Sequence, residues 1–514
     1  MSQSTPLFAA QVPIFPRKVA GTFRRLKWVV MLVTLGIYYV TPWIRWDRGP
    51  NLPDQAVLVD LAGRRFYFFW IEIWPHEFYF VAGLLIMAGL GLFLFTSALG
   101  RVWCGYTCPQ TVWTDLFIAT ERWIEGDRNA RIRLWKGKWD ARKWRLRLSK
   151  WVVWAFIGLA TGGAWVFYFA DAPTLARDLV TGTAHPVAYA TMAVLTFTTV
   201  LLGGFAREQV CIYMCPWPRI QGAMMDEGTL TVGYRDWRGE PRGKKHENRE
   251  GDCIDCMACV NVCPMGIDIR EGQQMACITC ALCIDACDDV MDKIGKPRGL
   301  IDYLALSDRP PETLAERLAV TPIGTQATGD AVTTAAAGAP APAPHAASAP
   351  IVTRADIKGW APQPVWKHIL RPRTILYTIA WAGIGIALVV ALFVRPDIDM
   401  TVAAVRNPTF VTLSDGTIRN AYDVRLRNKH GEDRAFHLSL ASDDLLRIEL
   451  EGRDDLTTIV PANETKLQRV YVSARPDDTA ARAARTDLRF WVEDLVSAER
   501  AWGDTHFFGQ GELR

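Results

Sequence analysis

Long apolar stretches alternate along this chain with polar segments rich in cations. Five stretches carry no charged residue, and each approaches the ~20 residues that a helix needs to cross a bilayer. They cover residues 28–44, 78–99, 151–170, 186–206 and 374–394. Arg, Lys or Trp residues stand at their edges, as is typical of membrane spans. The pattern therefore predicts a membrane protein with about five transmembrane helices, rather than buried core helices of a soluble protein.

The cations between these stretches predict the orientation of the helices. Segments 1–27 and 101–150 together contain seventeen Lys and Arg residues, whereas segments 45–77 and 171–185 contain five. Cation-rich loops of membrane proteins remain in the cytoplasm. We therefore expect the N-terminus and the 101–150 loop in the cytoplasm, and the chain from about residue 397 in the periplasm. The expected location is the inner membrane of a bacterium.

Beyond Pro396 the pattern changes to an alternation of apolar and polar residues, which is the period of a half-buried strand. Tyr422, Val424 and Leu426 alternate with charged residues, and similar runs follow at 436–440 and 488–492. Turn-forming sequences separate these runs. The pattern predicts an antiparallel, immunoglobulin-like β-sandwich. Since this domain has no Cys and no expected cluster of ionisable residues, we expect docking or protection there rather than catalysis.

Two further segments have a distinctive composition. Residues 308–350 are rich in Ala, Pro and Thr, which predicts a flexible linker, and 358–373 form a basic approach to the fifth stretch. Residues 66–78 are dense in aromatic side chains, which predicts a segment at the outer membrane interface. Its Glu72, His76 and Glu77 either face water there or hold a metal or a quinone head.

Eight of the 12 cysteines form two runs with the same spacing. The runs are Cys253, Cys256, Cys259 and Cys263 before Pro264, and Cys277, Cys280, Cys283 and Cys287. Bacterial ferredoxins hold two [4Fe–4S] clusters with this spacing, and the fourth Cys of each run ligates the other cluster. We therefore assign Cys253, Cys256, Cys259 and Cys287 to one cluster, and Cys277, Cys280, Cys283 and Cys263 to the other. Zinc sites use paired arms instead.

Charge and cysteine usage agree with this assignment. The net charge of +4 on 514 residues is too small to indicate nucleic-acid binding. Reduced thiols and clusters belong in the cytoplasm, because an oxidising compartment would favour disulfides. The predicted domains are an N-terminal segment (1–27), a four-helix membrane domain (28–206), a cytoplasmic ferredoxin-like domain (207–307), a linker with its basic approach (308–373), a fifth helix (374–394) and a sandwich (397–514).

The remaining four cysteines form two copies of the motif C-x-x-x-C-P. Cys104 and Cys108 follow the second stretch, and Cys211 and Cys215 follow the fourth. Residues at i and i+4 share a helix face, so each copy is expected to present two sulfurs together at the cytoplasmic interface. A copper site with Met214 as an added thioether ligand, a further iron–sulfur centre, a dithiol relay and two inert pairs all remain open.

The order of these motifs, followed by Lys296-Pro297-Arg298-Gly299-Leu300-Ile301-Asp302-Tyr303, resembles the cytochrome c oxidase accessory proteins CcoG, also called FixG or RdxA. The resemblance covers nearly the whole chain, although the linker is longer than expected. It implies a cupric reductase that supplies Cu(I) for assembly of cbb3-type cytochrome c oxidase. It also implies that Cys104, Cys108, Cys211 and Cys215 handle copper or the final electron transfer.

The partners implied by this resemblance are copper, and oxidase assembly factors or copper chaperones, besides the lipid bilayer. The electron donor is not identified by the sequence, and a homodimer stays open. Two alternative functions also remain. The first is a quinol-oxidising electron-transfer subunit like the NapH-type membrane ferredoxins, which share the paired motifs and lack the C-terminal domain. The second is a non-redox assembly scaffold in which the clusters are structural.

Overall fold

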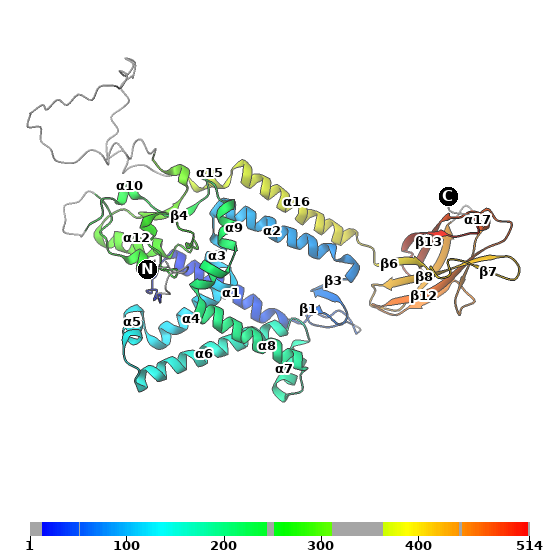
Figure 1. The fold of residues 1–514 in the computed structure, drawn as a ribbon, viewed down its shortest axis with the longest axis horizontal. Coiled ribbons are helices and arrows are strands. Elements are labelled where there is room, and N and C mark those ends of the chain that lie inside the picture. Colours follow the sequence, from blue (N-terminus) through cyan, green and yellow to red (C-terminus); the bar gives the residue numbers. More distant parts are fainter. Residues whose placement is uncertain (1–12, 51, 244–250, 311–362, 442–444, 512–514) are drawn as a thin grey trace, which may run out of the picture. The chain divides into compact units, whose positions relative to one another are not determined.

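The computed structural model describes residues 13–50, 52–243, 251–310, 363–441 and 445–511 of the chain. It divides into two compact units (Figure 1). The first lies within Met1–Pro42 and Pro75–Gly385 and contains all the cysteines, and the second lies within Trp43–Trp74 and Ile386–Arg514. Residues 311–362 of the predicted linker lie outside the described residues.

Four segments of the described chain are long and apolar enough to cross a membrane. They are Thr22–Trp43 with α1 (Thr22–Val40), Pro75–Leu99 with α2 (Tyr79–Leu99), Pro186–Ala206 with α8 (Pro186–Thr199) and the π-helix η3 (Val200–Ala206), and α16 (Pro372–Val394). None of the apolar window of α16 is buried inside the protein. A helix that exposes apolar side chains all round is typical of a membrane span.

The predicted third span at 151–170 is not among these four. It belongs to α6 (Ala141–Val166), whose first ten residues include five cations, and the helix ends four residues earlier than predicted. The apolar part of this helix is therefore only 151–166, which is short for a bilayer. The expected count of five spans, and the orientation that depends on it, are not confirmed. The apolar part of α6 nevertheless packs closely on α8, because Gly158 and Gly162 let the backbone carbonyls of Thr196 and Met192 approach.

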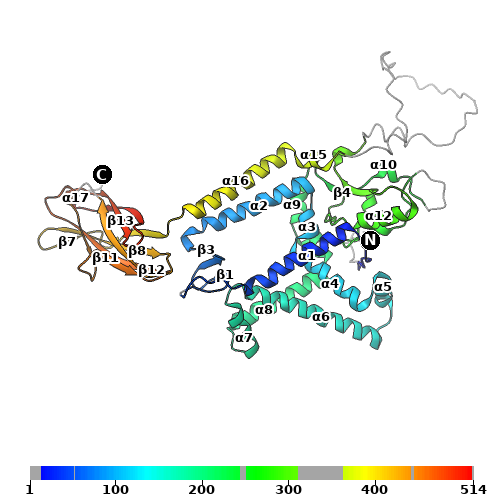
Figure 2. The ribbon, with the colours of Figure 1, turned by 180° about the vertical axis from the view of Figure 1, so that it is seen from behind.

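The basic 101–150 loop folds into short helices that precede the apolar part of α6. They are α3 (Val102–Tyr106), α4 (Pro109–Glu125) and α5 (Arg128–Lys136). Within the same unit, α2 lies beside α16 in both views (Figure 1, Figure 2). A Cβ atom at Gly91 of α2 would lie 3.2 Å from the indole Nε1 of Trp381 on α16, so these two helices are in direct contact.

The cysteine-rich segment is closed by a small sheet of β4 (Thr231–Tyr234) and β5 (Ile301–Leu304), which pair antiparallel. Between the strands lie α11 (Ala258–Val262) and α12 (Leu282–Ile294). Asp285 of α12 accepts hydrogen bonds from the backbone N–H groups of Phe23 and Arg24, at 3.2 and 2.7 Å. A carboxylate at the positive end of a helix is stabilising. The cysteine-rich segment thus caps α1, the first apolar helix.

The ends of the predicted linker are anchored in the first unit. Before the undescribed residues, Asp308 lies in the 3-10 helix Leu306–Asp308; after them, the basic approach contains α15 (Val365–Ile369). His368 Nε2 of α15 lies 2.9 Å from Asp308 Oδ2, and both side chains are buried. The basic approach is therefore partly helical and packed, which the composition did not indicate.

The second unit contains the predicted antiparallel sandwich, and that prediction is confirmed. Its sheets have the strand orders β10-β12-β8-β6, with β7 beside β8, and β11-β9-β13-β14. The strands are β6 (Ile398–Ala404), β7 (Val411–Thr412), β8 (Ile418–Asn428), β9 (Arg434–Ala441), β10 (Arg447–Leu450), β11 (Thr457–Val460), β12 (Thr465–Ala474), β13 (Thr486–Asp494) and β14 (Arg500–Phe507). Tyr422, Val424 and Leu426 are buried in its core, as their alternation predicts.

The same unit includes a short sheet that the sequence analysis missed. Strands β1 (Val57–Asp60), β2 (Arg65–Phe68) and β3 (Ile71–Ile73) form an antiparallel meander through the aromatic segment. Glu72 of β3 pairs with Arg65 of β2 at 3.0 Å. Its carboxylate is therefore engaged in the sheet, while the placement of this segment at an outer membrane interface stays a prediction.

Candidate metal centre

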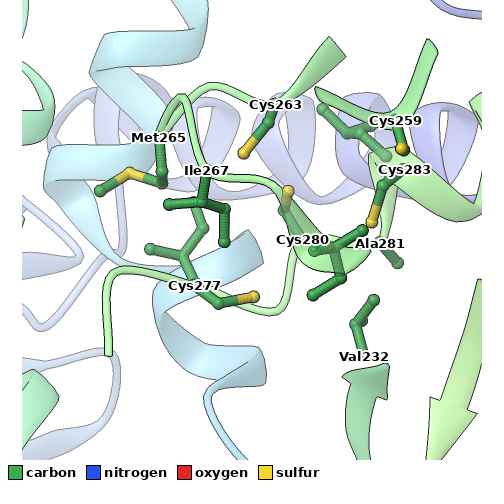
Figure 3. Close-up of a pocket in the computed structure, with 12 residues that line it drawn as sticks. Val232, Cys259, Cys263, Met265, Ile267, Cys277, Cys280, Ala281 and Cys283 are labelled. Carbon is green, nitrogen blue, oxygen red and sulfur yellow. The ribbon is translucent and has the colours of Figure 1, made fainter. Parts of the chain in front are cut away.

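The eight cysteines of the two runs line two cavities in the first unit. One cavity is lined by Cys253, Cys256, Cys259 and Cys287. The other is lined by Cys263, Cys277, Cys280 and Cys283, together with Cys259, and Figure 3 shows sulfur atoms lying around this space. Each cavity thus gathers three cysteines of one run and the last cysteine of the other. Because Cys259 lines both, the cavities are neighbours.

Each run turns sharply at the same two positions. Asp255 and Met257 in the first run, and Thr279 and Ala281 in the second, all have positive φ angles between 52° and 59°. Non-glycine residues rarely adopt this left-handed conformation, and it occurs where surrounding structure imposes it. The turns bring the three closely spaced sulfurs of a run to one side, and the Thr279 N–H lies 3.5 Å from Cys277 Sγ.

Burial determines the acidity of these thiols. It raises the pKa of Cys259 to about 11 and that of Cys263 and Cys287 to about 12, and it raises the pKa of Cys283 well above its ordinary value. Thiolates in such a place need a compensating positive charge. Bound iron supplies this charge, and it therefore deprotonates a coordinating thiol outright. Eight soft donors in two groups of four, all of them buried or partly buried except the exposed Cys256, therefore fit two [4Fe–4S] clusters.

The two C-x-x-x-C-P motifs have the same local geometry, but it differs from the predicted one. Cys104 lies on α3 and Cys211 on the π-helix Val210–Met214, whereas Cys108 and Cys215 follow these helices with ψ angles of 127° and 124°. The residue before a proline is pushed into this extended region by the proline ring. The prediction that each pair shares one helix face is therefore wrong.

Tertiary packing nevertheless brings the two motifs together. Cys104 and Cys211 belong to one hydrophobic cluster. Burial raises the pKa of Cys211 to about 12, and repulsion from the thiolates of Cys108, Cys104 and Cys215 adds to this increase. These four cysteines, called the four-cysteine group below, therefore lie within electrostatic reach of one another. Met214, by contrast, is 64% exposed.

Two polar residues that the sequence analysis missed hold this group in place. The Cys104 thiol donates a hydrogen bond to Gln221 Oε1 at 3.0 Å, and Gln221 Nε2 donates to Thr96 Oγ1. Arg101, which is 3% exposed, donates to the carbonyl of Met275. Its charge opposes the increase in the pKa of Cys104, Cys211 and Cys277 that burial causes. Arg101 therefore favours negative charge in this part of the molecule.

The four-cysteine group packs directly on the second run. A Cβ atom at Gly105 would lie 2.7 Å from the Ile278 carbonyl oxygen and 3.1 Å from Cys280 Cα. The Tyr106 hydroxyl donates to the Cys280 carbonyl at 3.2 Å, and Cys263, Cys280 and Cys283 share one hydrophobic cluster with Cys104 and Cys211. The first cavity, the second cavity and the four-cysteine group thus form a continuous series of sulfur sites.

One group of potential ligands lies outside this series. Asp397, His430 and Glu499 of the second unit have ligand atoms within 4.8 Å of one another. The expectation that the C-terminal domain has no cluster of ionisable residues is therefore wrong. The three residues are far apart in the sequence and follow no motif spacing, so only folding could reveal them. All three are at least partly accessible, which is common for acidic groups without a metal.

Family models match most of this chain. A 4Fe-4S dicluster domain matches residues 206–306, a 4Fe-4S binding domain matches 80–129, and the family described as "IG-like fold at C-terminal of FixG" matches 388–510. The first match contains both runs together with Cys211 and Cys215, and the second contains Cys104 and Cys108. Both motif copies therefore fall within regions similar to iron–sulfur proteins.

Similar proteins extend over the whole length. Protein RdxB of Cereibacter sphaeroides is 62% identical over 99% of both chains, and protein RdxA of that organism is 60% identical over 96% of both. Nitrogen fixation protein FixG of Rhizobium meliloti is 55% identical over 92% of this chain and 86% of its own. A crystal structure of a FixG-related protein from Vibrio parahaemolyticus has 20% identity and a TM-score of 0.20, covering 23% of this chain and 99% of that one.

Proposed function

Because this chain belongs to the FixG and Rdx family of iron–sulfur electron-transfer proteins, we propose that it is a membrane-bound cupric reductase. It converts Cu(II) to Cu(I) for the assembly of cbb3-type cytochrome c oxidase. The observation that carries this proposal is the packing of the four-cysteine group on the second cysteine run through Gly105. A one-electron reduction needs such a short path between an electron carrier and a soft metal site.

In this proposal the two runs hold the resident cofactors. Cys253, Cys256, Cys259 and Cys287 hold one [4Fe–4S] cluster, and Cys263, Cys277, Cys280 and Cys283 hold the other. Each cluster, when bound, supplies reversible transfer of one electron. The chain places Cys259 in the walls of both sites and packs the second site against the four-cysteine group.

Cys104, Cys108, Cys211 and Cys215 then bind the copper ion as substrate. Cu(II) accepts one electron from the iron–sulfur side and becomes Cu(I). Soft thiolates prefer Cu(I), so the group stabilises the product over the reactant. The thiols of Cys104 and Cys211, whose pKa burial raises to about 11 and about 12, release their protons to water when the metal binds.

We further propose a bacterial inner-membrane location with the cysteines in the cytoplasm and the sandwich in the periplasm. The support is the density of cations in α5 and at the start of α6, which is typical of cytoplasmic loops. The partners in this proposal are the lipid bilayer, copper, and oxidase assembly factors or copper chaperones. The sandwich provides a docking surface for the assembly factors or chaperones. The proposal also includes a homodimer among the oligomeric states of the protein.

The test is a double substitution, Cys104→Ser with Cys211→Ser, in the purified full-length protein. Dithionite-driven reduction of Cu(II), measured with a Cu(I) chelator, should fall to background, while iron and acid-labile sulfide remain at the wild-type level. Thr107→Ser with Tyr213→Phe changes the same two motifs without removing a sulfur and should keep the activity. Copper reduction at the wild-type rate in the double cysteine variant would refute the proposal.

A further inference from the structure

The first unit contains a cavity of about 680 Å³ between the start of α6 and the end of the fourth apolar segment. This volume lies in the range of sites for small organic ligands. Both aromatic and charged side chains line it. Its lining includes Trp151, Trp154, Phe205, Arg207, Glu121 and Glu208. α6 passes from its cationic to its apolar part at Lys150 and Trp151, so the membrane location proposed for this protein puts the cavity at the level of a membrane interface.

The cations around this cavity already have partners. Lys143 donates to two backbone carbonyls, at 3.1 and 2.7 Å. Arg147 pairs with Glu125, Lys150 pairs with Glu121 and Glu125, and Arg207 pairs with Glu121. A basic pocket at a membrane surface otherwise binds anionic lipid headgroups. Here the carboxylates and carbonyls compete with a phosphate for these donors, which favours a neutral ligand.

The apolar part of the wall suits a flat ring. Trp154 is 1% exposed and is held edge-on against Phe205, with ring centroids 5.5 Å apart. The centroid of the Trp151 ring lies 6.5 Å from that of Phe205. Offset and edge-to-face aromatic arrangements at these distances are favourable. A planar ring entering the cavity therefore meets aromatic surfaces that are already positioned.

Glu208 lies in the wall between this cavity and the pocket beside the sulfur sites. It is 6% exposed, and in the described part of the chain its carboxylate accepts one hydrogen bond, from Gln209 Nε2 at 3.3 Å. Glu208 and Arg207 line this cavity and also a neighbouring pocket whose wall includes Cys211, Met265 and Ile278. A buried carboxylate with spare acceptor capacity thus stands between the ligand space and the four-cysteine group.

We propose that this cavity binds a membrane quinol, and that Glu208 accepts its protons. The inference rests on the proposed function and supplies its electron donor. The quinol loses two electrons, one to each of the two iron–sulfur centres, and becomes the quinone. The Glu208 carboxylate takes the first proton, passes it to solvent, and then takes the second.

Binding is tested with a photoreactive azido-quinone on the holoprotein in nanodiscs. Label should appear on peptides of α6 and 200–208, and decylubiquinol should compete with it. The substitution Phe205→Ala should reduce labelling at least several-fold, whereas Trp123→Leu, which changes an exposed ring outside the cavity, should not. Label that cardiolipin displaces and decylubiquinol does not would identify a lipid site and overturn the inference, as would label confined to other helices.

The role of Glu208 is tested by anaerobic reduction of the iron–sulfur absorbance with decylubiquinol. Loss of a general base costs about 100-fold in rate, so Glu208→Gln should slow this reduction by that order, and Glu208→Asp should recover part of it. Glu227→Gln, at an exposed position, serves as the control. Unchanged quinol oxidation in Glu208→Gln would overturn the inference.

A dithionite-driven assay separates this inference from the proposed function. Glu208→Gln should reduce Cu(II) at the wild-type rate when dithionite replaces the quinol. If the wild-type protein oxidises quinol but reduces no copper with either donor, the proposed function fails and the quinol site stands. If dithionite drives copper reduction and quinol does not reduce the centres, the quinol site fails and the proposed function stands.

Discussion

The two ferredoxin-like runs and the four-cysteine group are both sets of sulfur ligands, but they are assembled by different means. The runs lie within 35 consecutive residues, 253–287, and repeated left-handed turns bring their sulfurs together. The four-cysteine group combines motifs more than 100 residues apart. Contacts of Gly105, Arg101 and Gln221 with distant elements hold it. Local chain geometry thus makes the first set, and tertiary packing makes the second.

The largest expected effect distinguishes the two sets by metal content. Cys283→Ser removes a partly buried donor of the second cavity, and we expect about half of the iron and sulfide to be lost, because one of two clusters loses a ligand. Cys108→Ser, in the four-cysteine group, should leave both contents unchanged. Equal iron loss in the two variants would show that the two sets are one metal-binding unit and would remove the contrast.

A smaller effect is expected where the two sets touch. In Gly105→Val, the added side chain meets the Ile278 and Thr279 carbonyls at less than 3 Å, and overpacking of this kind costs about 1–3 kcal/mol. We expect copper reduction to fall about tenfold or more, with iron content retained. Gly36→Ala is the matched control, since a Cβ atom there has nothing within 4 Å. Undiminished copper reduction in Gly105→Val would mean that this contact is not the electron path.

The smallest effect concerns the support of Gln221. Asp226 follows the helix that carries Gln221, and it pairs with Arg371 at 2.6 Å and Arg373 at 3.1 Å. Burial alone would raise the pKa of Asp226, but hydrogen bonds from Arg371, Thr229 and Arg373 lower it to about 2. A lowered pKa means that this stabilisation is present above about pH 4 and disappears as the pH falls through about 2.

We therefore expect Asp226→Asn to lower the free energy of unfolding by about 1 kcal/mol at neutral pH, since this partly exposed pair is screened by solvent. The difference between variant and wild type should shrink toward pH 2, as thermal unfolding in detergent at several pH values can measure. Asp454→Asn, at an exposed position outside this network, is the control. A difference that persists unchanged at low pH would contradict the assignment to ionised Asp226.

Elements with a strong local signal could be predicted from the sequence. The alternation at Tyr422, Val424 and Leu426 identified a sandwich strand, because one face of a strand is buried whatever its neighbours are. The uncharged stretch at 374–394 likewise became α16. The 151–170 stretch was less well predicted, because composition shows apolarity but not where a helix ends or how its cationic first half packs.

The residues of the candidate metal centre likewise divide into those that a local sequence signal identifies and those that only the fold reveals. Spacing alone identified the eight ferredoxin-like cysteines, since their ligand geometry is short-range. The prolines after Cys108 and Cys215 indicate that each local helix ends there, but the i, i+4 expectation kept both cysteines inside the helix, although the residue before a proline is pushed out of the helical conformation. That signal was present and could have been used. Arg101, Gln221 and the cluster of Asp397, His430 and Glu499 have no motif spacing, so no local signal could have identified them.

The amino-acid sequence by itself determined the apolar segments, the two four-cysteine runs and the alternating strands, because each depends on residues a few positions apart. Tertiary structure decided that Cys104 and Cys211 meet beside Cys280, that Arg101 lies buried near them, and that Glu208 separates an aromatic cavity from the sulfurs. The physical reason is that burial, charge neighbours and cavities arise only when distant segments pack, and no local pattern encodes which segments those are.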